Sequence, residues 1–281
     1  MRRFLVAAIV SLVLTSAGPH GQAPSPGTGG DTPTGDETPA AWFVQLASPP
    51  LIEGSAAETL EAEEARFHLA AAGVGIEYRE TGHYRHLWNG LTIETAATDD
   101  SLIKVPGVVA VFPVIPARRA QQEQTPLDVA DMITALHAGG ADVAQDDFGL
   151  SGRGIRVAVL DSGIDYDHPD LGGCFGKDCR VAMGWDFVGD AFNPDRTSPT
   201  YNPLPVPDAD PDDCDGHGTH VAGIIGANGT IRGVAPQVTL HAYRVFGCVG
   251  PTTTDVILAA MERAYQDGAD VLNMSLGAPF Q

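Results

Sequence analysis

The apolar positions in the second half of the chain fall into short continuous runs. Such runs are typical of buried strands in a parallel sheet, because helices cover both faces of that sheet. Between two of the runs, residues 255–267 place Ile257 and Met261 on one side of a helix. Strands that alternate with helices predict an α/β fold for residues 126–281, a parallel sheet with helices on both faces. The predicted strands are residues 155–160, 238–246 and 269–276.

Residues 41–116 have a different pattern, with shorter segments in which apolar and polar residues often alternate. Ser55 and Glu58 have the spacing of a capping box, which predicts the start of a helix, and Gly73 is well placed to end it. We expect strand, helix, strand, strand, helix and strand in that order, which is typical of a small ferredoxin-like α+β sandwich. The other expected elements are strands at residues 42–46, 76–84, 88–95 and 108–114 and a short helix at residues 98–105.

The first residues of the chain predict export. Arg2 and Arg3 precede an apolar run at residues 4–14, and small residues follow it. This run is too short to span the roughly 30 Å hydrocarbon layer of a membrane, so residues 1–17 are interpreted as a signal peptide. No later run approaches the ~18 apolar residues of a membrane span, and no membrane anchor is expected. We therefore expect a secreted, extracellular protein.

Two polar segments are predicted to be linkers. Residues 18–40 are rich in Pro, Gly, Thr and Ser and have no apolar period, which indicates a disordered linker. Residues 117–125 are polar and contain the basic pair Arg118 and Arg119, which is typical of an exposed, cleavable linker.

The chain is strongly acidic. Its formal net charge is −20, because 36 acidic residues stand against 16 Lys and Arg. A field of this sign repels nucleic acid and anionic membrane surfaces, so both are excluded as partners. Solubility alone also accounts for the acidity. Five aspartates at residues 208–215 suit either calcium, basic substrate side chains or simply solvent.

An even number of cysteines in an exported chain indicates two disulfides. Zinc is the alternative, because His217 and His220 lie close to a cysteine. A zinc site would need tightly spaced ligand pairs, which this sequence lacks, so disulfides are favoured. The cysteines are Cys174, Cys179, Cys214 and Cys248.

The strand at residues 155–160 leads directly into Asp161, Ser162 and Gly163. It delivers Asp161 to the carboxyl end of the predicted sheet, where α/β proteins place their sites. A carboxylate held there by N–H donors can fix the orientation of a partner side chain. An aspartate that only caps the next turn has the same local pattern.

His217 lies between Gly216 and Gly218, which leave its ring open to approach. A neutral imidazole can take a proton from a hydroxyl nucleophile if a carboxylate fixes its tautomer. A purely structural histidine also fits this local pattern. A zinc metalloprotease motif would need a glutamate after the first histidine and a second histidine four residues on, whereas His220 is three residues on.

Together, in this order and at this separation, the two segments resemble the aspartate and histidine motifs of the subtilisin-like serine proteases, or subtilases, whose triad order is Asp, His, Ser. The resemblance continues through residues 233–246 and residues 270–277. It covers residues 126–281, and its details are similar to those of large multidomain extracellular subtilases. Residues 41–116 resemble the inhibitory propeptide of that family.

The resemblance implies a secreted serine endopeptidase precursor that acts on proteins or peptides. In it, Asp161 orients and stabilises the imidazolium and His217 is the general base. An extended substrate would pair with the cleft strands, and the chain's own propeptide would act as an intramolecular inhibitor. No cofactor is implied for the chemistry. The implied substrate-binding residues are Ser275, Leu276, Gly277, Gly247 and Gly250.

Two structural features also follow from the resemblance. Cys174 and Cys179, which are close in sequence, would bridge, and Cys214 would pair with Cys248, because the family places the segment before the histidine beside the loop that borders the cleft. Asp170 matches a position that ligates structural calcium in some subtilases, so structural calcium is a possible cofactor.

The family's serine lies in a Gly-Thr-Ser segment, and this segment occurs nowhere in the 281 residues. The oxyanion asparagine that follows in the family is also missing. We therefore expect an N-terminal fragment that ends before the serine and is inactive alone. The alternatives are a non-catalytic protease-binding or propeptide-like inhibitory protein, and an α/β hydrolase with Asp161 as nucleophile. The coding sequence downstream of Gln281 distinguishes them.

Overall fold

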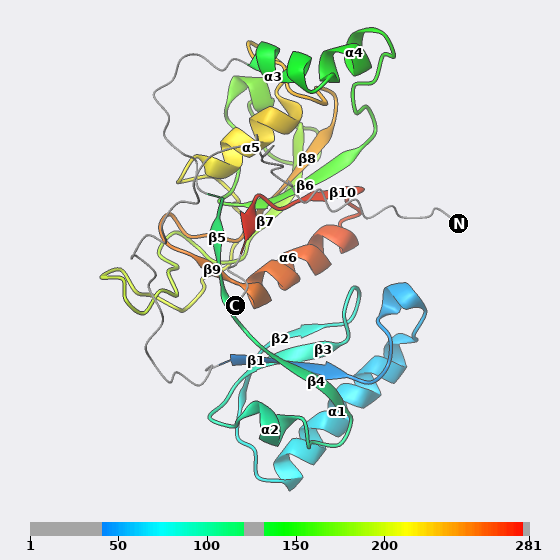
Figure 1. Ribbon diagram of the computed structural model, residues 1–281, viewed down its shortest axis with the longest axis vertical. Helices are drawn as coiled ribbons and strands as arrows, with labels where there is room; N and C mark the ends of the chain where they lie inside the picture. Colours follow the sequence, from blue (N-terminus) through cyan, green and yellow to red (C-terminus); the bar gives the residue numbers. More distant parts are fainter. Residues whose placement is uncertain (1–40, 121–131, 278–281) are drawn as a thin grey trace, which may run out of the picture.

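The computed structural model describes residues 41–120 and 132–277 (Figure 1). The predicted signal peptide and the linker at residues 18–40 lie outside the described residues. The described chain forms an antiparallel sheet, a parallel sheet and a small sheet that joins the two regions.

The first region, residues 41–113, is here called the amino-terminal unit. Its four strands are all antiparallel and have the order β2-β3-β1-β4. This is the βαββαβ arrangement predicted for the segment. Its elements are β1 (Ala41–Leu46), the 3-10 helix η1 (Leu51–Glu53), α1 (Ala57–Gly73), β2 (Arg79–Tyr84), β3 (Gly90–Glu94), α2 (Asp99–Leu102) and β4 (Val108–Pro113).

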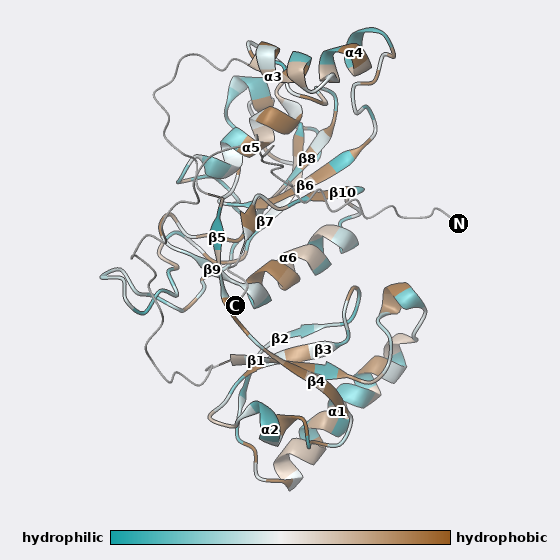
Figure 2. Ribbon diagram, viewed as in Figure 1, coloured by the Kyte–Doolittle hydropathy of each residue, from teal (hydrophilic) through white to brown (hydrophobic). Residues whose placement is uncertain are grey.

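The two faces of the antiparallel sheet have different partners. Alternate side chains of a strand point to opposite faces, so Val44 of β1 joins the core made with Phe67 of α1 and Leu102 of α2. Phe43 points the other way, where its ring lies 5.7 Å from that of Trp88. Figure 2 shows that the edge strand β2 is mostly hydrophilic, as expected for a strand that pairs on one side only.

Helix α1 begins without the predicted capping box. Ala56 occupies the N-cap position in an extended conformation and offers no side-chain cap. The spacing of Ser55 and Glu58 was therefore misleading, because the helix begins one residue too late for Ser55 to act as its cap.

The second region contains the predicted parallel sheet, with the order β10-β6-β8-β7. Of its strands, β7 was not expected. Its apolar run is short, because Gly184 interrupts it and Asp186 ends it. The elements of this sheet are β6 (Arg156–Asp161), β7 (Val181–Asp186), β8 (Thr239–Arg244) and β10 (Val271–Asn273).

Two helices cover the two faces of the parallel sheet. Val157 and Val159 of β6 pack with Val221 of α5 (His217–Gly226). Ala158 and Leu160 face the opposite side and pack with α6 (Thr254–Gln266). This arrangement confirms the α/β class predicted from the apolar runs. The remaining elements are α3 (Met132–Ala138), α4 (Ala141–Asp146) and the 3-10 helix η2 (Pro169–Leu171).

Helix α6 lies between the two large sheets (Figure 1). Its outer side contacts the amino-terminal unit, where the Tyr84 hydroxyl donates to the carbonyl of Asp255 at 3.1 Å. A third sheet, of order β11-β5-β9, joins the two regions and consists of β5 (Pro116–Arg119), β9 (Thr252–Thr253) and β11 (Leu276–Gly277). Residues 117–119, predicted to belong to a linker, are thus part of a strand.

Candidate active site

Asp161 and His217 meet at the carboxyl edge of the parallel sheet. Asp161 is the last residue of β6 and is fully buried, and His217 is the first residue of α5. The Nδ1 atom of His217 lies 2.7 Å from Oδ1 of Asp161. Two motifs that are 56 residues apart in sequence are therefore brought within hydrogen-bond distance.

The close approach of α5 to β6 depends on glycine. A Cβ atom on Gly218 would lie 2.1 Å from the carbonyl oxygen of Gly163. Gly163 itself has a φ of +111°, in the region that favours glycine. Its neighbour Ser162 accepts a hydrogen bond from the Gly218 N–H at 2.9 Å. The small residues around both motifs thus allow the helix to begin against the end of the strand.

The surroundings of Asp161 act on its pKa in opposite directions. Burial raises the pKa, while the hydrogen bond to His217 and the Ser162 N–H lower it, and burial prevails. Its Oδ1 accepts from the Ser162 N–H at 2.7 Å as well as facing His217. With Asp161 ionised, Nδ1–H donates to the carboxylate, so Nε2 is left as the proton acceptor.

Asp213 holds the loop that leads into α5. Its Oδ1 accepts from the N–H groups of Asp215 and Gly216, both at 2.9 Å. Its Oδ2 accepts from the N–H and the hydroxyl of Thr219. The sequence marked Asp213 only as one of an acidic group, whereas the structure gives it a role in fixing the backbone around His217.

The predicted substrate strand is paired in the structure with a segment of the same chain. Leu276 and Gly277 pair with Arg119 and Arg118 in antiparallel register. The carbonyl of Ser275 accepts the N–H of Ala120 at 3.1 Å. Residues 118–120, together with His217, line a cavity of about 550 Å³.

Of the two glycines predicted to border the cleft, one contacts residues 118–120 and the other does not. The carbonyl of Gly250 accepts from Arg119 at 3.4 Å. Gly247 instead packs against the carbonyl of Phe192, where a Cβ atom would lie at 2.1 Å. The backbone of β5 pairs on this side with Thr252 and Thr253 of β9. These two residues could not be singled out from the sequence, because a strand of two residues has no periodic signal.

Both disulfides implied by the resemblance are present. Cys174 bridges Cys179, and Cys214 bridges Cys248, with Cα separations of 5.6 and 5.3 Å. The second bridge joins the segment before His217 to the loop that precedes β9.

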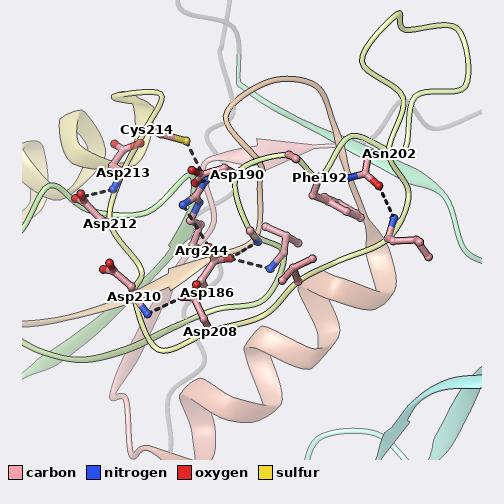
Figure 3. A pocket seen from close by; sticks show the side chains of 15 residues that line it. Asp186, Asp190, Phe192, Asn202, Asp208, Asp210, Asp212, Asp213, Cys214 and Arg244 are labelled. Atoms are coloured by element: carbon pink, nitrogen blue, oxygen red, sulfur yellow. Dashed lines mark hydrogen bonds and ion pairs between the residues drawn. The ribbon is translucent and has the colours of Figure 1, made fainter.

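An acidic cavity of about 480 Å³ lies beside the second bridge (Figure 3). Arg244 is buried at its wall and forms ion pairs with Asp186 at 3.3 Å and Asp190 at 2.8 Å. Asp208 and Asp210 also line this cavity. Of the other aspartates in residues 208–215, Asp212 and Asp213 line this cavity as well, whereas Asp215 lines the cavity beside His217.

Asp170, the calcium candidate, accepts backbone N–H groups. They come from Thr230 at 2.8 Å and Ile231 at 2.9 Å. These donors lower the pKa of Asp170, the Ile231 N–H most strongly. Within residues 41–120 and 132–277, neither group of side chains with metal-ligand spacing includes Asp170. Its carboxylate is satisfied without a metal, and calcium binding stays a prediction.

The contact between Glu262 and the amino-terminal unit could not be predicted from the sequence. Glu262 of α6 is buried, and its carboxylate accepts four successive backbone N–H groups, those of residues 85–88, at 2.7 to 3.3 Å. The partners are more than 170 residues apart, so no local pattern marks the pair.

Among the helices in the described ranges, none has the length and apolar character needed to cross a membrane.

Comparisons with known proteins place these motifs in a family context. Residues 152–280 match the sequence model of the Subtilase family. The chain is 39% identical over 201 residues to the minor extracellular protease Vpr of Bacillus subtilis, a match that covers 69% of this chain and 23% of that protein. It is 37% identical over 135 residues to subtilisin DY of Bacillus licheniformis, covering 47% and 40%.

Two solved structures share the fold. The epidermin leader peptide processing serine protease of Staphylococcus aureus has a TM-score of 0.54 at 19% identity, covering 85% of this chain and 50% of that one. Fervidolysin of Fervidobacterium pennivorans has a TM-score of 0.52 at 20% identity, covering 89% and 38%. The chain thus spans half or less of the length of each of these proteins.

Proposed function

We propose that this chain, which belongs to the subtilase family of serine proteases through residues 152–280, is part of the precursor of a secreted serine endopeptidase. The single observation that supports this most directly is the 2.7 Å contact between Asp161 and His217 at the end of the parallel sheet. The pair supplies a general base and its orienting carboxylate, which are two of the three groups of a serine-protease triad.

The third group is proposed to come from a Gly-Thr-Ser segment that is not among the 281 residues. In the proposed reaction, Nε2 of His217 accepts the proton of the serine hydroxyl as that oxygen attacks a peptide carbonyl. The imidazolium is stabilised by Asp161, then gives the proton to the leaving amine. Without the serine and the oxyanion donors, residues 1–281 alone would not hydrolyse peptides.

We propose that residues 41–116 are an inhibitory propeptide. Support comes from β5, which lies between β9 and β11 and leads the chain past His217 as an extended substrate would. The buried contact of Glu262 with residues 85–88 would hold the unit in place. The structural likeness to the Staphylococcus aureus protease covers 85% of the chain. Residues 117–281 are a smaller share of the chain than this, so the likeness extends into the amino-terminal unit.

Secretion is proposed on the basis of residues 1–17 and two disulfides, which form and persist in oxidising compartments. The match to an extracellular protease agrees with this proposal.

The proposed function is tested by expressing the reading frame that encodes residues 1–281 together with whatever follows Gln281. We expect a Gly-Thr-Ser segment downstream and hydrolysis of a casein substrate by the processed product. His217→Ala should lower kcat/KM by at least 10³-fold, because the base is lost. His137→Ala is the matched control, since His137 is exposed on α3, and it should leave kcat/KM unchanged. A downstream frame with no such segment, or hydrolysis that survives His217→Ala, would refute the proposal.

A further inference from the structure

We infer that Asp215 makes the cavity beside His217 selective for arginine, so that the substrates are peptides with an arginine in register with Arg119. This inference rests on the proposed function, since it names the substrate class of the same cleft.

The side chain of Arg119 is held on three sides. Its Nη1 lies 3.2 Å from Oδ2 of Asp215, in an ion pair whose side chains are 17% and 27% exposed. Its Nη2 donates to the carbonyl of Gly250 at 3.4 Å. Its guanidinium carbon lies 5.1 Å from the centre of the Phe246 ring, at cation–π distance.

The neighbours of Arg119 in the strand show that this contact is specific to one position. Side chains alternate along an extended strand, so Ala117 and Arg119 share one face and Arg118 lies on the other. Ala117 is buried, Arg119 is half-buried and Arg118 is exposed. Both arginines line the cavity, but it is Arg119, on the face shared with Ala117, that pairs with Asp215.

Asp215 links recognition to the catalytic base. While its Oδ2 faces Arg119, its Oδ1 accepts the N–H of His217 at 3.3 Å. Its own N–H donates to Asp213, which fixes the position of the loop. The carboxylate is thus held in place before an arginine arrives, which reduces the entropic cost of binding one.

The geometry favours arginine over lysine. A guanidinium presents two nitrogens at once, here to Asp215 and to Gly250, and its flat face suits the Phe246 ring. A lysine ammonium is a single point charge and reaches one of these acceptors at a time. Alanine would make none of the three contacts, and glutamate would place a like charge beside Asp215.

The first test needs no catalysis. Amide hydrogen exchange of residues 117–120 is measured in the 281-residue chain and its variants. We expect about tenfold faster exchange in Asp215→Asn and in Arg119→Ala, and little further change when both are combined, because the two side chains act as one unit. Arg119→Lys should lie between wild type and Arg119→Ala. Arg118→Ala removes the same charge from the other face and should change exchange less than threefold.

The second test measures selectivity in the processed product of the longer reading frame. Peptides copied from residues 116–122 carry Arg, Lys, Ala or Glu in place of the second arginine. We expect kcat/KM to fall at least tenfold from Arg to Ala, and the Arg-to-Ala ratio to collapse in Asp215→Asn.

The two tests separate this inference from the proposed function. If the product hydrolyses no peptide at all, the proposed function fails, and the exchange experiment still decides whether Asp215 binds Arg119. If the product is active but has no preference for arginine, the inference is wrong and the proposed function stands. The same holds if Asp215→Asn changes neither the amide exchange of residues 117–120 nor the Arg-to-Ala ratio of kcat/KM.

Discussion

At the scale of single residues, the Asp161–His217 pair owes its geometry to groups that do no chemistry themselves. The carboxylate of Asp213 satisfies four donors in the loop before and at the start of α5. Gly218 allows that helix to begin within contact distance of Gly163. The contact between Asp161 and His217 could be predicted from the sequence, because each residue lies in a short motif that resembles one of the subtilase motifs. Asp213 could not, because its role depends on the folded path of the loop.

We predict that Asp213→Asn lowers the free energy of unfolding by about 2 kcal/mol at pH 7, because an amide nitrogen would then face N–H donors. Burial raises the pKa of Asp213, but the Thr219, Gly216 and Asp215 donors outweigh it and lower the pKa below 3.8. This stabilisation is therefore fully present above the unfolded pKa of 3.8 and is lost as pH falls through the folded pKa.

Urea unfolding at pH 7, 5 and 3 measures this effect. The difference between wild type and Asp213→Asn should be constant from pH 7 to 5 and shrink at pH 3. The control is Asp212→Asn, whose exposed carboxylate accepts a single N–H within the described part of the chain, that of Asp213. It should change stability by less than about 0.5 kcal/mol. Equal effects of the two substitutions would show that Asp213 is an ordinary surface aspartate.

At the scale of elements, apolar runs located β6 and β8 well, because buried strands of an α/β fold have a strong local signal. The helical spacing of Ile257 and Met261 located α6. The run at residues 269–276 was predicted as one strand but is divided in two. Val271–Asn273 pair with β6 in the parallel sheet, whereas Leu276 and Gly277 pair with β5. Which strand a residue pairs with is a tertiary property, and the apolar pattern alone does not contain it.

The contact between α6 and the amino-terminal unit gives a prediction at this scale. Glu262→Gln replaces one carboxylate oxygen with an amide group that faces N–H donors, and it removes the charge that strengthens the four hydrogen bonds. We expect a cost of about 2–3 kcal/mol. Amide exchange at residues 85–88 should accelerate about 30- to 140-fold, because each ~1.4 kcal/mol is a factor of ten.

Glu61→Gln provides the matched control for this prediction. Glu61 forms an ion pair with the Arg85 side chain of the same loop at 3.0 Å, but it is 58% exposed. Exposed pairs contribute little, so exchange at residues 85–88 should change less than threefold. Protection that is unaffected by Glu262→Gln would mean that the sheet face, not this carboxylate, holds the unit on α6.

At the scale of the whole molecule, the two regions are connected in a way that the sequence did not predict. Residues 117–125 were interpreted as an exposed linker because they are polar and basic. In the structure, Ala117 is buried and β5 joins the strands on both of its sides. The polar composition of Arg118 and Arg119 is explained by strand alternation and by the carboxylate of Asp215. A segment whose polar partners lie elsewhere in the fold looks like a linker when it is read alone.

The central claim is that His217 activates a serine from the continuation of this chain. Labelling with a serine-directed phosphonate, followed by mass spectrometry, tests it most directly, because the reagent reacts only with an activated hydroxyl. We predict that the processed product of the longer reading frame is labelled on the serine of a Gly-Thr-Ser segment. Labelling should disappear in His217→Ala and slow in Asp161→Asn, and residues 1–281 alone should not be labelled. Labelling of a serine within residues 1–281, such as Ser162 or Ser275, or labelling that persists in His217→Ala, would contradict the account.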